Sequence, residues 1–156
     1  MPQWELVIMV AALMSLNALA IDIMLPALSN ISDFYSLTRD NDQQLVIFAY
    51  IAGFGAPQLV FGPISDRYGR KGLLRICLVG YAIAGIACIM TSSFMTLLLA
   101  RFIQGVFASG VRVIAVSIVR DLLAGRAMAR IMSLVMTVFM VVPILAPTIG
   151  DRKSGV

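Results

Sequence analysis

Long apolar stretches separated by short polar segments dominate the chain. A helix needs about 20 mostly apolar residues to cross a bilayer, and five stretches approach or exceed that length. They cover about residues 6–28, 45–64, 73–90, 95–119 and 131–149. The pattern predicts an all-α integral membrane protein with five transmembrane helices within residues 1–150, followed by a polar tail at 151–156.

The composition supports this prediction. Of the 156 residues, 60% are hydrophobic and 13% are charged, whereas a soluble chain is about half apolar and about a quarter charged. One compact core could not hide so many apolar side chains from water, which excludes disorder, a disulfide scaffold and most classes of soluble enzyme. We expect the first stretch to remain in the mature protein, because it is long for a signal peptide and Asp22 interrupts it.

The basic residues predict an orientation in the membrane. Lys and Arg gather in cytoplasmic loops, and the second-to-third and fourth-to-fifth connections hold seven of them: Arg67, Arg70, Lys71, Arg75, Arg120, Arg126 and Arg130. The opposite side holds three, namely Arg39, Arg152 and Lys153. We therefore expect a multi-pass membrane protein with a cytoplasmic N-terminus. The net charge of +4 is explained by this placement, so no nucleic-acid partner is expected.

Three ionisable residues fall within the predicted spans: Asp22, Arg101 and Arg112. Charges at membrane depth are costly and usually functional. Asp22 and Arg101 each lie about 9 Å below the outer surface at the helical rise per residue, so they can pair if their spans are neighbours. The structural interpretation is a fixed ion pair, or an Arg101 that reaches the headgroups. The functional interpretation is a carboxylate that gains and loses a proton.

Other kinds of chemistry find little support. The chain has no histidine and two cysteines, which argues against a metal centre or a cofactor. No nucleophile–base pair is visible either, so we do not expect an enzyme. The small residues Gly53 and Gly55 in the second span, and Gly105 and Ser109 in the fourth, are typical of closely packed membrane helices.

Several motifs resemble one family. Residues 62–74 read GPISDRYGRKGLL, which resembles the Gly-x-x-x-Asp-Arg-x-Gly-Arg-Lys signature of the major facilitator superfamily in the same loop. The sequence RFIQG at residues 101–105 is similar to that family's Arg-x-x-Gln-Gly motif, and VVPILAPTIG at 141–150 to the motif of its drug antiporters. The segment around Asp22 and the pair Arg120-Asp121 resemble the bicyclomycin/chloramphenicol-resistance branch of drug:proton antiporters.

The resemblance implies roles for the matching residues. Proton coupling would involve Asp22, Arg101 and Gln104. Asn17, Tyr50 and Arg112 would line a central cavity. The cytoplasmic gate would comprise Gly62, Asp66, Arg67, Gly69, Arg70, Lys71 and Asp121, with Gly62 and Gly69 allowing a tight turn and close helix approach. Pro143, Pro147 and Gly150 would form the antiporter helix motif.

The implied function is multidrug efflux from bacteria, in which a lipophilic drug-like substrate is exchanged for protons across the lipid bilayer. A half of such a transporter has six spans, whereas this chain has five and ends in the polar sequence DRKSGV. We therefore expect an N-terminal fragment, produced by truncation, by a frameshift or by deliberate expression. It would need a complementary half, or oligomers, for activity. The alternatives are a non-transporting relic or interaction subunit, and a uniporter or symporter of the same fold.

Overall fold

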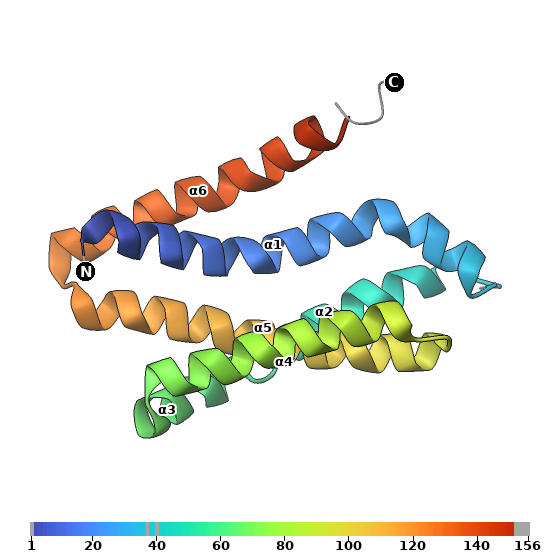
Figure 1. The fold of residues 1–156 in the computed structure, drawn as a ribbon, viewed down its shortest axis with the longest axis horizontal. Helices are drawn as coiled ribbons and strands as arrows, with labels where there is room; N and C mark the ends of the chain where they lie inside the picture. The colour runs from blue at the N-terminus through green and yellow to red at the C-terminus, as the bar shows by residue number, and fades with distance from the viewer. Residues whose placement is uncertain (1, 37, 40, 152–156) are drawn as a thin grey trace. The chain divides into compact units, whose positions relative to one another are not determined.

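The computed structural model describes the backbone of residues 2–36, 38–39 and 41–151, and the side chains of these except 23, 25–29, 142–143 and 146–151. Within these residues the chain forms helices and no strands, which confirms the all-α prediction. The helices are α1 (Gln3–Phe34), the 3-10 helix η1 (Asp42–Gln44), α2 (Leu45–Gly55), α3 (Gln58–Tyr68), α4 (Arg70–Met90), α5 (Phe94–Leu122) and α6 (Gly125–Asp151) (Figure 1).

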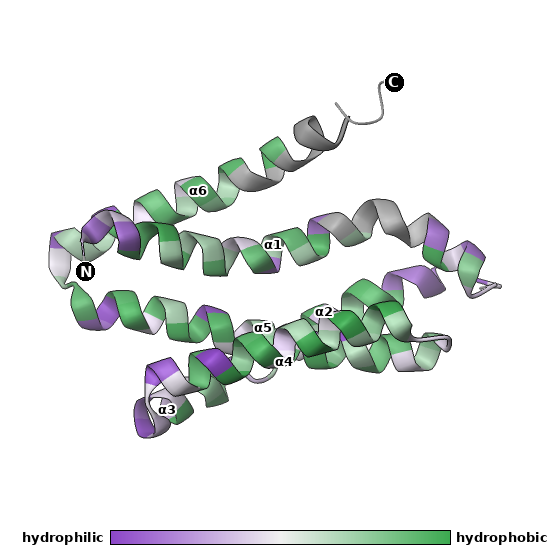
Figure 2. Cartoon of the chain, viewed as in Figure 1, coloured by the Kyte–Doolittle hydropathy of each residue, from purple (hydrophilic) through white to green (hydrophobic). Residues whose placement is uncertain are grey.

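The helices overlap the predicted spans but differ from them in their bounds. Three segments are long and apolar enough to cross a bilayer: residues 3–22 of α1, α4 and α5. The bent pair of α2 and α3 makes a fourth among the described residues. Helix α6 overlaps the fifth predicted span, but it is not among the membrane-span candidates of the described residues, so the fifth transmembrane span stays a prediction. A helix satisfies its own backbone hydrogen bonds, as the bilayer interior requires, and polar residues gather where helices meet, notably between α3 and α4 (Figure 2).

The second span is not one continuous helix. We predicted one transmembrane helix over about 45–64, whereas α2 ends at Gly55 and α3 begins at Gln58, with a bend of 45° between them. Pro57 causes the break, because proline has no N–H to donate to the carbonyl four residues earlier. Helix α3 begins directly after Pro57. The Pro57 carbonyl accepts hydrogen bonds from the N–H groups of Val60 and Phe61 at 3.0 and 3.1 Å.

The chain divides into two units that share α1 and α5. Unit 1 comprises residues 1–22 and 115–156, and unit 2 comprises residues 23–114. Unit 1 has an apolar interior built from the first part of α1, the end of α5 and the start of α6. Its buried side chains are Leu6, Val10, Ala11, Leu13, Met14, Ala115, Val119, Ile131 and Val135.

Unit 2 is held together by backbone contact between α2 and α5. A Cβ atom at Gly53 would overlap the carbonyl oxygen of Phe102, and one at Gly105 would overlap the carbonyl oxygen of Tyr50. The expected close packing is therefore present at these two glycines. It is absent at Gly55, around which no described atom lies within 4 Å of an added Cβ.

A second apolar cluster joins α1 to the turn between α4 and α5. Met24, Val46 and Leu97 are buried there, and Tyr35 and Phe94 pack against them. The Tyr35 and Phe94 ring centroids lie 5.9 Å apart. This cluster fixes the end of α1 beside the α4–α5 turn and so forms one wall of the pocket described next.

Candidate functional site

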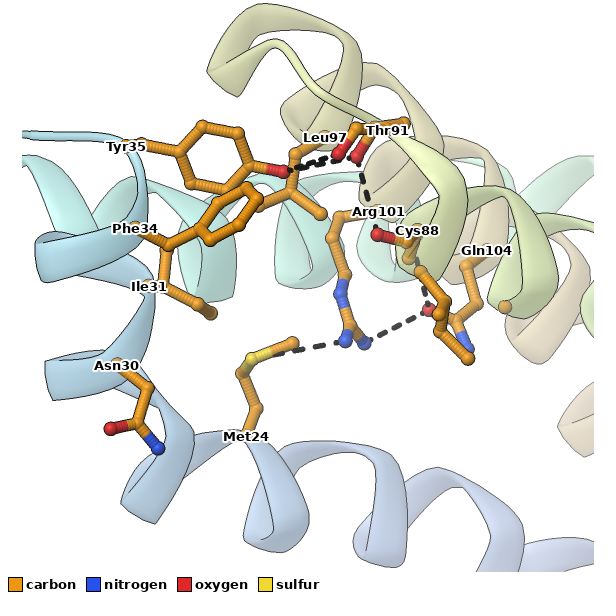
Figure 3. Close-up of a pocket in the computed structure, with 12 residues that line it drawn as sticks. Met24, Asn30, Ile31, Phe34, Tyr35, Cys88, Thr91, Leu97, Arg101 and Gln104 are labelled. Carbon is orange, nitrogen blue, oxygen red and sulfur yellow. Dashed lines mark hydrogen bonds between the residues drawn. The ribbon is translucent and has the colours of Figure 1, made fainter.

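A pocket of about 550 Å³ lies in unit 2, near the turn between α4 and α5. Its walls are largely apolar and aromatic, and its polar side chains come from three helices (Figure 3). The pocket is lined by Met24, Asn30, Ile31, Phe34, Tyr35, Gly85, Cys88, Ile89, Thr91, Leu97, Arg101 and Gln104.

The guanidinium group of Arg101 is the charged group of this pocket. Its Nη1 donates to Oε1 of Gln104 at 3.0 Å, and its Nη2 approaches Sδ of Met24 at 3.7 Å. The Nε atom is buried and has no hydrogen-bond partner among the described residues. Within the described part of unit 2 no carboxylate pairs with Arg101. The pocket thus contains a positive charge whose donors are only partly used.

Gln104 holds the guanidinium in place. Positions three apart on a helix share a face, which brings Gln104 next to Arg101 on α5. Its side chain is buried, and Oε1 also accepts from the Cys88 thiol at 3.9 Å. One amide therefore links Cys88 on α4 to the arginine, while the role of Gln104 in proton coupling stays a prediction.

Tyr35 closes one side of the pocket by joining α1 to the α4–α5 turn. Its hydroxyl donates to the Thr91 carbonyl at 2.8 Å and lies 3.2 Å from the Thr91 hydroxyl. Thr91 Oγ1 in turn donates to the Cys88 carbonyl at 3.2 Å. Phe34 packs edge-on against the Tyr35 ring, with centroids 4.9 Å apart. The wall therefore combines aromatic surface with a fixed polar contact.

Asp22 belongs to unit 1, whereas Arg101 belongs to unit 2. One carboxylate oxygen of Asp22, Oδ2, is buried and has no hydrogen-bond partner among the described residues. A buried carboxylate oxygen without a donor is costly, so this atom calls for a partner or a proton. The pairing of Asp22 with Arg101 stays a prediction.

Arg112 and Tyr50, two of the three residues predicted to line a cavity, both contact the ring of Phe54. Phe54 itself was not predicted from the sequence. The Arg112 guanidinium carbon lies 5.6 Å from the centre of the Phe54 ring, within the range of a cation–π interaction. The Phe54 ring stacks on Tyr50 with centroids 6.4 Å apart. Asn17 belongs to unit 1, and its place in a cavity stays a prediction.

The gate motif surrounds the junction of α3 and α4. Arg70 Nη2 and Asp66 Oδ1 are 3.0 Å apart, and this ion pair links the end of α3 to the start of α4. Gly69 separates the two helices with φ 86°, a value that L side chains rarely adopt. The Arg67 guanidinium lies 5.8 Å from the Tyr68 ring centre, and Lys71 is exposed.

Three motif predictions have other outcomes. The expected close approach at Gly62 is wrong for the described residues: this glycine lies within α3, and an added Cβ would meet nothing within 4 Å. Asp121 belongs to unit 1, so its contact with the α3–α4 junction stays a prediction. The antiporter helix motif falls within α6, but the side chains of Pro143, Pro147 and Gly150 lie outside the described residues.

Sequence reasoning did not find the other walls of the pocket. Four further residues contact Arg101 or its neighbours in the pocket: Met24, Tyr35, Cys88 and Thr91. None of them is an unusual residue type for an apolar stretch or its end, so the sequence does not mark them as functional. The signal that could have found them is proximity to a span end, since Tyr35 and Thr91 both lie where an apolar stretch gives way to a polar one.

Comparison with known proteins identifies similar chains. Residues 9–151 match the family model described as the Major Facilitator Superfamily. The chain is 36% identical to an uncharacterized MFS-type transporter YdgK of Bacillus subtilis (strain 168), over 86% of this chain and 33% of that protein. It is 34% identical to multidrug resistance protein MdtL of Klebsiella pneumoniae (strain 342), over 89% of this chain and 35% of that protein. It is also 31% identical to multidrug resistance protein D of Escherichia coli (strain K12), over 94% and 37%. The chain therefore spans about a third of the length of these curated relatives.

Proposed function

The chain belongs to the major facilitator superfamily of membrane transporters, and we propose that it supplies the N-terminal spans of a multidrug:proton antiporter in a bacterial inner membrane. Two relatives are named as multidrug resistance proteins, and this similarity supports the substrate class. Because the chain covers about a third of those relatives, transport is proposed for a protein that also contains the remaining spans.

The observation that carries the proposal is the pair of incompletely satisfied groups at Asp22 and Arg101. Each has a buried polar atom without a hydrogen-bond partner among the described residues, and the helical rise predicts that both lie about 9 Å from the same membrane surface. In the proposed cycle the Asp22 carboxyl loses its proton on one side of the membrane and regains it on the other, and its pairing with Arg101 is the prediction made from the sequence. Alternating exposure of this carboxyl to the two sides of the membrane would move one proton inward as the substrate moves outward.

The α3–α4 junction would control the cytoplasmic side of this cycle. The Asp66–Arg70 ion pair is a largely exposed contact between α3 and α4, and exposed pairs of this kind contribute about 0.2–1 kcal/mol. Contacts from Asp121 would add to this contribution in one state and be lost in the other. A ligand or a proton shifts the equilibrium between the two arrangements of α3 and α4 if its binding free energies for them differ by a similar amount.

A completed transporter tests the proton role of Asp22. We would fuse residues 1–150 to the remaining spans of multidrug resistance protein D and measure efflux driven by an imposed pH gradient in inverted vesicles. Asp22→Asn is neutral at all pH values, so it should abolish pH-driven efflux while the protein still inserts. Asp33→Asn is the matched control, because Asp33 lies on the same helix and is exposed. Unchanged efflux with Asp22→Asn would remove this carboxyl from the mechanism.

A further inference from the structure

The pocket beside Arg101 has a chemical character that the proposed function does not specify. Within the described part of unit 2, the guanidinium has no carboxylate partner. Its Nη2 faces the Met24 thioether at 3.7 Å, and sulfur of this kind is a weak acceptor. Arginine presents five donors in a planar fork that matches a carboxylate. The arrangement leaves part of that fork available to an anionic oxygen.

We propose that this pocket binds lipophilic molecules that carry a carboxylate or a comparable anionic group, with the anion on the Arg101 guanidinium. The proposal deepens the transport function described above, on which it rests, by naming the class of substrate. A charge-assisted hydrogen bond is roughly twice as strong as a neutral one, so the anion would displace the Met24 sulfur from Nη2.

The size and the walls of the pocket suit the rest of such a molecule. A volume of about 550 Å³ falls within the roughly 300–1,000 Å³ of small-molecule pockets. Ile31, Leu97 and the rings of Phe34 and Tyr35 supply an apolar surface on which an aromatic or branched body can pack. Gln104 keeps the guanidinium in position before the molecule arrives, which lowers the entropic cost of binding.

Cys88 provides a natural reporter of occupancy. It lines the pocket, and its thiol contacts Gln104 Oε1. Both cysteines of the chain are free, and the other, Cys77, is 1% exposed. A chain carrying Cys77→Ala therefore reports only on the pocket when it is alkylated. A molecule bound beside Arg101 would cover Cys88 and slow this reaction.

The experiment measures the alkylation of Cys88 by N-ethylmaleimide in the full chain, reconstituted with Cys77→Ala into phosphatidylcholine vesicles. Three probes share one ring system: 1-naphthoate, 1-naphthamide and 1-naphthylmethylammonium. We expect 1-naphthoate to slow alkylation by about fivefold, the neutral amide by less than about twofold, and the cation not at all, in line with the greater strength of charge-assisted bonds. Equal protection by naphthoate and naphthamide would overturn the proposal.

A matched pair of variants assigns the effect to Arg101. Arg101→Gln keeps a polar side chain and removes the charge, so naphthoate protection should fall to the level of the amide. Arg75→Gln removes an exposed cation from α4, 13 residues (88 − 75) and about 20 Å along the helix from Cys88, and should keep full protection. If Arg101→Gln fails to insert, Arg101→Lys serves instead and should retain part of the protection. Unchanged protection with Arg101→Gln would contradict the assignment.

The lipid composition separates a soluble anion from a lipid headgroup. Vesicles containing about one fifth phosphatidylglycerol offer an anionic headgroup at the same membrane surface. If this lipid protects Cys88 as well as naphthoate does, the pocket is a lipid site and the proposed substrate class is wrong. Because alkylation requires no transport, loss of efflux in a completed transporter would leave this result unchanged. Conversely, failure of naphthoate to bind would leave the proton role of Asp22 standing.

Discussion

At the residue scale, the position of Arg101 has a local cause and a distant one. The contact with Gln104 follows from helical spacing and could be predicted from the sequence. The contact with Met24 joins residues 77 positions apart, and no local pattern indicates it. The same holds for Tyr35 and Thr91, which are 56 positions apart. The charged half of the site was thus predictable, whereas its walls depend on how α1 packs against the α4–α5 turn.

The Tyr35 hydroxyl offers a test of that packing. Tyr35→Phe removes its bond to the Thr91 carbonyl and should lower the free energy of unfolding by about 1 kcal/mol, the usual net value of such a bond. Unfolding in sodium dodecyl sulfate mixed micelles, followed by circular dichroism, measures the change. Tyr68→Phe is the control, because the Tyr68 side chain is exposed and the ring over which Arg67 lies is kept. Equal losses in the two variants would contradict a structural role for the Tyr35 hydroxyl.

At the element scale, hydropathy predicts the spans well but does not reveal the break between α2 and α3. Residues 45–64 are apolar on both sides of Pro57, so a hydropathy window reads them as one helix. The glycines beside Pro57 were interpreted as packing residues, which holds for Gly53 and not for Gly55. Periodicity and length fix where a helix lies, whereas the contacts of each small residue depend on its neighbours in space.

Gly53 and Gly55 form a matched pair for testing the α2–α5 contact. Gly53→Ala places a methyl group against the Phe102 carbonyl and should destabilise the folded chain by about 2 kcal/mol, a typical cost of overpacking. Gly55→Ala meets no atom within 4 Å and should change stability by less than about 1 kcal/mol, because alanine favours the helix. The same micelle unfolding assay measures both variants. Similar stabilities would show that α2 and α5 separate easily.

Gly69 tests the junction of α3 and α4. Gly69→Ala must adopt φ 86°, a strained conformation that costs on the order of 1–3 kcal/mol. Gly72→Ala, three residues on, meets no atom within 4 Å and has no positive φ, so it should leave stability nearly unchanged. Limited proteolysis at Arg67 and Arg70 measures the opening of the junction, and we expect faster cleavage in Gly69→Ala alone. Equal cleavage rates in the two variants would argue against strain at Gly69.

At the scale of the whole molecule, each unit exposes large apolar side chains that a soluble protein would bury. On α4 these follow a helical repeat at Ile76, Val79, Ile83 and Ile86, all more than half exposed. Such a stripe fits contact with lipid or with further helices. The orientation is a prediction from the basic residues through the positive-inside rule, because apolar faces alone carry no direction.

Labelling of single cysteines in whole cells tests this orientation. In a background with Cys77→Ala and Cys88→Ser, Ser92→Cys lies in the exposed turn between α4 and α5, and Tyr68→Cys lies at the exposed junction of α3 and α4. A membrane-impermeant maleimide should label Ser92→Cys in intact cells and Tyr68→Cys only after permeabilisation. The opposite pattern would place the N-terminus outside and reverse the proposed direction of proton movement.

The interlocked backbones of α2 and α5 also limit how this sequence can evolve. Gly53 and Gly105 each face a carbonyl group of the other helix, so a side chain at either position would push the two helices apart and open the second contact as well. Once one of these two glycines has been substituted, the other no longer contributes to the α2–α5 contact. Restoring close packing then requires changes on both helices. Among descendants of this sequence the two glycines should persist together or disappear together, while Gly55 drifts freely.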